Sequence, residues 1–132
     1  MKRFLIVLFV MTIILTGCNE MNNNEQGFKD TAYKKISVED AKDIIDSEDV
    51  IILDVRTLEE YNDGHIENAV LLPVTEISNR ADEVLPDKDA KILVYCRSGN
   101  RSATASKELI NMGYTNVYDF GGINSWPYEI VK

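Results

Sequence analysis

The sequence predicts an α/β fold: a single three-layer domain with a mainly parallel sheet flanked by helices. Two observations lead to this prediction. Residues 50–53 and 92–95 are continuous apolar runs, as in strands buried on both faces. Segments with apolar residues at helical spacing alternate with such runs, which favours parallel strands joined by helices. The chain has 132 residues, 45% hydrophobic and 27% charged, which suits one globular domain.

The domain is expected to begin with a weak strand and a helix. Residues 33–36 form the strand candidate. Ser37 follows as a helix cap, and acidic residues occupy the first turn behind it. One face of this predicted helix is apolar and carries Val38, Ala41, Ile44 and Ile45.

The next strand, residues 50–53, leads into a short helix. Thr57 and Glu60 have the spacing of a capping box, and Gly64 is placed to end the helix. Residues 69–72 then form a further short strand.

The second half of the domain repeats this alternation. Residues 77–85 have helical spacing, 92–95 form a strand, and a helix is predicted from Ser102 to its C-terminal cap at Gly113. Residues 116–120 form the last strand. The apolar face of the helix after Ser102 consists of Ala105, Leu109 and Met112.

The N-terminal residues have the pattern of a bacterial lipoprotein signal. Lys2 and Arg3 precede an apolar run at 4–15, which is too short to span a bilayer as a stable helix. The run ends in Leu15-Thr16-Gly17-Cys18, which resembles a lipobox whose cysteine is lipidated. The alternative is an uncleaved membrane anchor with a chance cysteine.

These features divide the chain into three parts. Residues 1–17 are a signal peptide, 18–31 a lipidated cysteine with a polar tether, and 32–132 the folded domain. Two acyl chains suffice for stable anchoring, so we expect the protein on the extracytoplasmic face of the cell membrane.

The charge of the chain excludes some partners. The formal net charge is −8, and removal of Lys2 and Arg3 leaves about −10. This argues against nucleic acid or anionic lipid headgroups as the main partner. With one histidine and one cysteine outside the lipobox, a closed metal site is not expected. We expect no cofactor and a monomer.

The segment 96–102 has the composition of a nucleophile-bearing loop. A strand ends at Cys96, and Arg97, Ser98, Gly99, Asn100 and Arg101 follow before the helix. Successive N–H groups in such a loop can bind an anion, and two nearby arginines lower a thiol's pKa. The alternative is an inert, buried cysteine. The sequence therefore predicts a reactive Cys96 beside an anion site.

Other polar residues are expected close to Cys96. Asp54 and Arg56 follow a strand, and the carboxyl ends of parallel strands share one edge of the sheet. We interpret both as supporting residues, together with an Arg56–Glu60 pair that pins the loop to a helix. His65 is expected to be a structural hydrogen-bonding residue, and Trp126 a core residue.

Several motifs together resemble the rhodanese domain family over residues 33–130. They are Asp54-Val55-Arg56, Glu60-Tyr61, Gly64-His65-Ile66-Glu67-Asn68-Ala69, the loop 96–102, and Gly121-Gly122 with Trp126. The resemblance implies a five-stranded parallel sheet and sulfurtransferase activity through a Cys96 persulfide.

This chemistry assigns a role to each loop residue. Cys96 attacks the outer sulfur of an anionic donor such as thiosulfate, and an external thiol or cyanide then accepts the sulfur. Arg97 is expected to bind the donor, and the amides of the loop to stabilise the persulfide. Arg101 either binds the donor as well or shapes the loop, through backbone carbonyls or a carboxylate such as Asp54.

Two other functions remain open at the level of sequence. Cysteine phosphatases also use a loop between a strand and a helix, with five residues between the cysteine and the closing arginine. Here only four separate Cys96 from Arg101, which disfavours a phosphoryl group. The other alternative is a non-catalytic persulfide carrier or protein-binding module.

Overall fold

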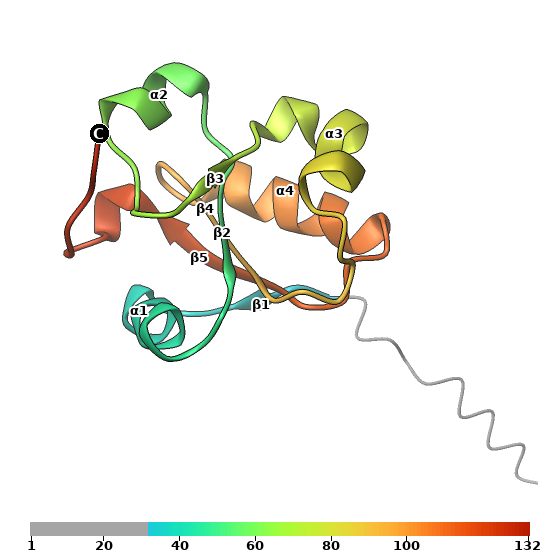
Figure 1. The fold of residues 1–132 in the computed structure, drawn as a ribbon, viewed down its shortest axis with the longest axis horizontal. Helices are drawn as coiled ribbons and strands as arrows, with labels where there is room; N and C mark the ends of the chain where they lie inside the picture. The colour runs from blue at the N-terminus through green and yellow to red at the C-terminus, as the bar shows by residue number, and fades with distance from the viewer. Residues whose placement is uncertain (1–31) are drawn as a thin grey trace, which may run out of the picture.

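The computed structural model of the protein describes residues 32–132, which form a five-stranded sheet in the order β1-β5-β4-β2-β3 (Figure 1). Every pair of neighbouring strands is parallel. The strands are β1 (Lys34–Lys35), β2 (Ile51–Asp54), β3 (Val70–Leu71), β4 (Ile92–Cys96) and β5 (Val117–Gly122). The predicted α/β class and the five parallel strands are confirmed.

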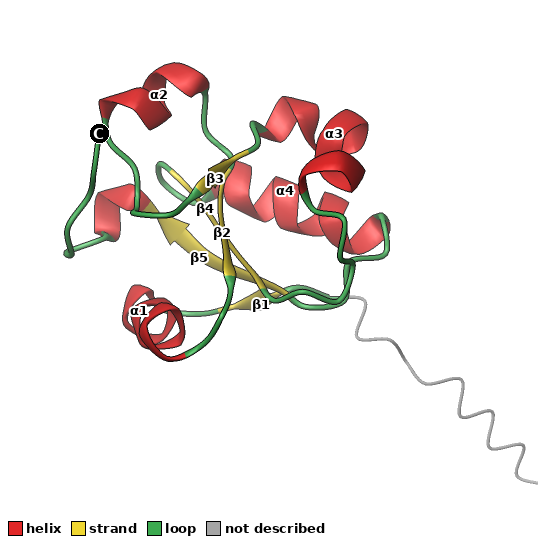
Figure 2. Cartoon of the chain, viewed as in Figure 1, coloured by secondary structure: helices red, strands yellow, loops and turns green. Residues whose placement is uncertain are grey.

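Helices cover both faces of the sheet (Figure 2). They are α1 (Val38–Ser47), α2 (Leu58–Asp63), α3 (Ile77–Val84) and α4 (Asn100–Asn111), with short 3-10 helices η1 (Val74–Glu76) and η2 (Ile123–Ser125). Helix α1 lies on one face, and α3 and α4 lie on the other (Figure 1). The domain therefore has the three layers that the sequence predicts.

Each face of the sheet has its own apolar core, because the central strands are buried on both sides. All five residues of β4 are buried and their side chains alternate between the cores. Val94 and Cys96 pack with Ala105 and Leu109 of α4. Leu93 packs on the other side, in the core that contains Ala41 of α1.

Local sequence signals mark the start of α2 and the end of α4 as expected. Thr57 and Glu60 form the predicted capping box. Gly113, at φ +97°, follows α4, and its N–H bonds to the Ile110 carbonyl at 3.0 Å. The next N–H, of Tyr114, bonds to the Leu109 carbonyl at 3.1 Å. This pair of bonds is a Schellman motif, in which the glycine adopts the left-handed conformation at low cost.

Several element boundaries differ from the sequence prediction, and three of the differences concern the sheet edge or the segments next to Cys96. The fourth helix begins at Asn100 rather than Ser102, because Gly99 at φ +109° already turns the chain into it. Strand β1 spans two residues instead of the predicted 33–36, since it pairs only with β5 at the sheet edge. Strand β5 continues to Gly122, opposite Cys96.

The predicted signal peptide, lipidated Cys18 and tether lie outside the described residues. Within 32–132, no helix is both long and apolar enough to cross a membrane.

Candidate functional site

Cys96 is the last residue of β4, at the carboxyl edge of the sheet. Strand β4 lies between β2 and β5, so residues from both neighbours flank the cysteine. Only 1% of the surface of Cys96 is exposed, so only small reagents can reach its sulfur. The site thus lies where ligands bind in open parallel sheets.

The Cys96 sulfur accepts hydrogen bonds from the loop that follows it. The Gly99 N–H lies 3.0 Å from Sγ. Burial raises the pKa of the thiol, but the Ser102 hydroxyl and the amides of Ser102, Gly99 and Ser98 outweigh it, so the pKa lies below its ordinary value. The loop therefore favours the thiolate through its amides, as expected, and through the Ser102 hydroxyl; the two arginines expected to lower this pKa are not among the main causes.

The Ser102 hydroxyl connects this loop to the last strand. It is fully buried in the first turns of α4. Its oxygen lies 3.0 Å from the Gly99 carbonyl oxygen and 3.3 Å from that of Gly121 in β5. The single hydroxyl proton thus has two carbonyl acceptors as well as the Cys96 sulfur.

Gly122 packs directly against the backbone of Arg97 and Ser98 in the loop. A Cβ atom at this position would lie 2.1 Å from the Arg97 carbonyl oxygen and 2.7 Å from the Ser98 Cα. Only glycine lets the two backbones approach this closely. The Asn124 N–H also donates to the Arg97 carbonyl, at 3.2 Å. The start of the loop is therefore held by the last residue of β5 and by η2.

Arg101 is engaged by Glu60 of α2. Its two terminal nitrogens donate to the two carboxylate oxygens at 2.7 and 2.9 Å. The guanidinium lowers the pKa of Glu60 to about 2. Of the two roles predicted for Arg101, the contacts match loop shaping through a carboxylate; the expectation of Asp54 as partner is wrong, because Asp54 is already occupied.

Asp54 is bound by Arg56 and Tyr95 in a buried network. The Arg56 guanidinium donates to both carboxylate oxygens at 2.7–3.1 Å, and the Tyr95 hydroxyl donates to Oδ2 at 2.7 Å. Arg56 also donates to the Gly64 carbonyl at 2.7 Å. The expected Arg56–Glu60 pair is therefore wrong. Asp54 and Arg56 instead fix the carboxyl end of β2 and the turn after α2.

Arg97 points to a hollow beside the loop. This hollow, about 360 Å³, is lined by Arg56, Glu60, Asp63, Gly64, Arg97, Ile123, Asn124 and Ile130. Arg97 is exposed and makes none of the ion pairs found within residues 32–132. It is therefore available to an anionic ligand, whereas Arg101 is held by Glu60.

The remaining predicted residues lie around the loop or away from it. Ser98, Gly99 and Asn100 border a second hollow on the β1 side of the loop. His65 stacks on Tyr61 at 3.7 Å between ring centroids, and its Nδ1 lies 2.9 Å from the Tyr61 carbonyl oxygen. Trp126 is buried against Phe120. The positions of His65 and Trp126 match structural roles.

Sequence reasoning missed three residues at this site. The sequence predicts only a strand residue at Tyr95, although a hydroxyl beside a strand end that carries an acid is a signal for its bond to Asp54. The close contact between Gly122 and the backbone of Arg97 has no signal in the local sequence beyond the pair Gly121-Gly122. Asp63, which lines the same hollow as Arg97, looks in sequence like any exposed helix residue.

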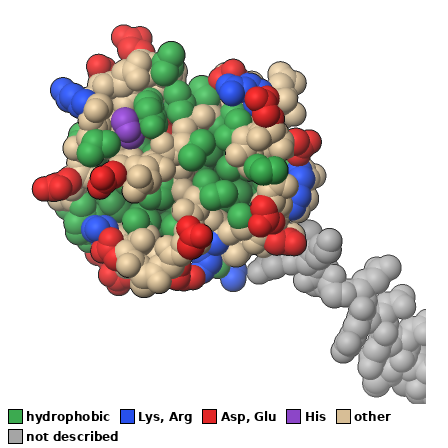
Figure 3. Space-filling view, viewed as in Figure 1, with side chains coloured by type: hydrophobic (Ala, Val, Ile, Leu, Met, Phe, Trp, Pro, Cys, Tyr) green, Lys and Arg blue, Asp and Glu red, His purple; other side chains and the backbone are tan. Residues whose placement is uncertain are grey.

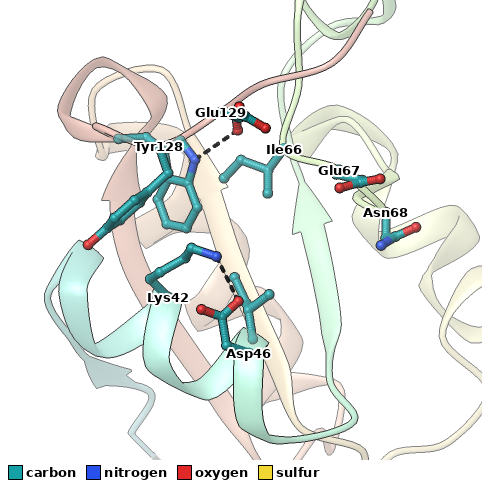
Figure 4. A pocket seen from close by; sticks show the side chains of 9 residues that line it. Lys42, Asp46, Ile66, Glu67, Asn68, Tyr128 and Glu129 are labelled. Carbon is teal, nitrogen blue, oxygen red and sulfur yellow. Dashed lines mark hydrogen bonds and ion pairs between the residues drawn. The ribbon is translucent and has the colours of Figure 1, made fainter.

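A larger hollow of about 480 Å³ lies on the α1 face (Figure 4). There Lys42 pairs with Asp46 at 2.6 Å, and the Trp126 indole N–H bonds to the Glu129 carbonyl at 3.4 Å. No residue of the segment 96–102 lines it. Across residues 32–132, no three His, Cys, Asp or Glu side chains are grouped so that they could hold a metal ion.

A parallel α/β domain with a thiolate-stabilising loop between its central strand and a helix defines a class of cysteine-dependent proteins. The profile of the rhodanese-like domain matches residues 37–128. The chain therefore belongs to the rhodanese-like domain family.

Similar proteins agree with this assignment. A thiosulfate sulfurtransferase, PspE of Escherichia coli, is 38% identical over 80 residues, covering 61% of this chain and 77% of that protein. The thiosulfate sulfurtransferase GlpE of Coxiella burnetii is 33% identical over 95 residues, covering 71% and 87%. A rhodanese-related protein from Thermoplasma volcanium superposes with a TM-score of 0.66 at 33% identity, covering 75% and 98%.

Proposed function

We propose that this protein is a sulfurtransferase that moves sulfane sulfur from a donor such as thiosulfate to a thiophilic acceptor through a persulfide on Cys96. The observation that carries the proposal is the Cys96 sulfur, which accepts the Gly99 N–H at 3.0 Å and whose pKa is lowered. Similarity to proteins named thiosulfate sulfurtransferases supports thiosulfate as the donor.

The first half-reaction forms the persulfide. The Cys96 thiolate attacks the outer sulfur of thiosulfate, a new S–S bond forms, and sulfite leaves with the electron pair of the broken bond. Arg97, exposed beside the hollow, binds the negative oxygens of the donor. The loop amides that stabilise the thiolate also stabilise the anionic persulfide.

The second half-reaction returns the thiolate. Cyanide or a thiolate attacks the outer sulfur of the persulfide, and the electron pair returns to Cys96 Sγ. Because the acceptor enters after sulfite has left, the donor and the acceptor can occupy the hollow that Arg97 lines one after the other. The lowered pKa of Cys96 enlarges the thiolate fraction, and that fraction attacks without a general base.

The decisive test uses residues 28–132 with thiosulfate and cyanide. We expect thiocyanate to form, and Cys96→Ser to abolish it. Sulfur loading without turnover would instead indicate a carrier. Hydrolysis of phosphate esters without sulfur loading would indicate a cysteine phosphatase.

We also propose that the domain is held on the extracytoplasmic face of the cell membrane by lipid on Cys18. The basic start, the short apolar run and the Gly17-Cys18 junction support this proposal. In a bacterial host the full chain should fractionate with membranes and Cys18→Ser should not. Membrane retention of the variant would favour an uncleaved anchor.

A further inference from the structure

We call the segment 96–102 the active loop. The hollow that Arg97 of this loop lines has the size of a small-molecule site, and part of its lining is apolar. Its volume, about 360 Å³, is at the lower end of the range for ligand pockets. Ile123 and Ile130 supply the apolar surface, and Ile130 is 49% exposed. The tail that carries Ile130 is fixed, because His65 and Val131 exchange backbone hydrogen bonds at 2.8 and 2.9 Å.

Four charged side chains line this hollow, and two of them are already neutralised. Arg56 is paired with Asp54, and Glu60 with Arg101. Arg97 and Asp63 have no ionic partner within 4.0 Å among residues 32–132. The hollow therefore offers one unpaired positive and one unpaired negative charge to a ligand.

The position of Asp63 is unfavourable for the helix that carries it. It is the last residue of α2, where the helix dipole is negative, and no basic residue lies in that turn. A cation bound there is stabilised by the Asp63 carboxylate and by the helix end together. Arg97, in contrast, comes from the loop that carries Cys96.

From this arrangement we propose that the sulfur acceptor is a zwitterionic aminothiol, of which free cysteine is the simplest. This proposal rests on the proposed function and names its second substrate. The acceptor's carboxylate binds Arg97, its ammonium binds Asp63, and its methylene group lies against the isoleucine wall. One small molecule thereby satisfies both free charges.

The transfer step balances without a further reactant. The acceptor thiol releases its proton to water, and its sulfur forms an S–S bond with the outer sulfur of the Cys96 persulfide. The Cys96 Sγ–S bond breaks and its electron pair remains on Sγ. The products are the Cys96 thiolate and the persulfide of the aminothiol.

Asp63 affects the two half-reactions in opposite directions. Its negative charge opposes a dianionic donor such as thiosulfate and favours an acceptor that carries an ammonium group. A residue with a purely structural role would change both half-reactions in the same direction. The comparison of the two therefore separates ligand recognition from misfolding.

The test measures both half-reactions on the full chain in detergent, for the unmutated protein, Asp63→Asn and the control Glu59→Gln. Glu59 is an exposed acid on the same helix that does not line the hollow. Loading by thiosulfate and discharge by cysteine, N-acetylcysteine and cyanide are each followed as single turnovers. Cyanide serves as the reference, because it carries no ammonium group.

We expect Asp63→Asn to lower the cysteine-to-cyanide rate ratio by about two- to fivefold and to raise the loading rate by a similar factor, as for loss of one exposed ion pair. The ratio for N-acetylcysteine, which keeps the carboxylate and lacks the ammonium, should not fall in Asp63→Asn, and neither ratio should change in Glu59→Gln. Equal ratios in Asp63→Asn and the unmutated protein, or loading and discharge falling together, would overturn the proposal. Failure of the unmutated protein to load sulfur would overturn the proposed function itself, and this proposal with it.

Discussion

At Cys96 two opposing effects act on one sulfur atom. Burial favours the neutral thiol, while the donors of the loop favour the thiolate, and the donors outweigh burial. The backbone amides are fixed by the fold, but the Ser102 hydroxyl can rotate among its acceptors. The side chain of Ser102 is therefore the part of this environment that a substitution can remove.

The first prediction concerns Ser102→Ala. Loss of one hydrogen bond to a charged group should raise the midpoint of Cys96 alkylation by iodoacetamide by about one pH unit. In the unmutated protein that midpoint should lie below 9.0, the ordinary thiol value. The reaction is followed by intact mass as a function of pH.

Ser106→Ala is the matched control for this prediction. Ser106 is also buried in α4, one turn further on, and its hydroxyl has no hydrogen-bond partner. Its removal should leave the midpoint unchanged. An equal rise in both variants would mean that packing in α4, rather than the Ser102 hydroxyl, sets the reactivity of Cys96.

Sequence alone pointed to Cys96 and its loop but not to the ion pairs around them. Cys96 could be found because its signal is local: an apolar run, a cysteine and a polar loop. Arg101 and Glu60 are 41 residues apart, so their pairing depends on how α2 and α4 are placed on the sheet. The same holds for Asp54, whose second partner Tyr95 is also 41 residues away.

At the scale of elements, the Glu60–Arg101 pair connects α2 to the first turn of α4. The second prediction is that Glu60→Gln lowers stability by less than about 1 kcal/mol at neutral pH, because the pair is partly exposed. The pKa of Glu60 is lowered from 4.5 to about 2, so its contribution is complete above 4.5 and is lost as pH falls towards 2.

Urea unfolding of Glu60→Gln and the unmutated protein at pH 6 and pH 3 measures this effect. The difference in unfolding free energy should be smaller at pH 3. A difference that grows on acidification would contradict the assigned pairing.

The third prediction concerns the contact between β5 and the active loop. In Gly122→Ala the new methyl would lie 2.1 Å from the Arg97 carbonyl oxygen, so the loop must move. We expect a loss of roughly 1–3 kcal/mol in stability and a fall of about tenfold or more in the rate of sulfur loading. Thermal unfolding and intact mass after thiosulfate measure the two effects.

Gly113→Ala provides the comparison for Gly122→Ala. Gly113 also has a structural reason to be glycine, its φ of +97°, but a Cβ there would meet no atom within 4 Å. This variant should lose about 1 kcal/mol and load sulfur normally. A comparable loading defect in both variants would assign the effect of Gly122→Ala to lowered stability.

At the scale of the whole molecule, the start of the described chain and the active loop lie at opposite ends of the parallel strands. Residue 32 lies at the N-terminal end of β1, whereas Cys96 lies at the C-terminal end of β4. Acidic side chains are spread over the face shown in Figure 3, with fewer basic ones among them. In the anchored protein that we propose, the tether therefore joins the domain at the end of the sheet opposite the active loop.

The architecture was predictable because each element carries its own signal and the connections of a parallel sheet have few alternatives. The two-residue strand β1 was the hardest element to delimit, since both its residues are exposed lysines and only pairing with β5 defines it. The close backbone contact at Gly122 depends on the register between β4 and β5, which no local pattern reports.

The central claim is that Cys96 carries sulfur, and intact mass spectrometry tests it most directly. Residues 28–132 are treated with thiosulfate, separated from it and weighed, beside Cys96→Ser treated in the same way. The account predicts a gain of one sulfur atom on the unmutated protein, reversed by cyanide, and no gain on the variant. An unchanged mass, or the same gain on both proteins, would contradict it.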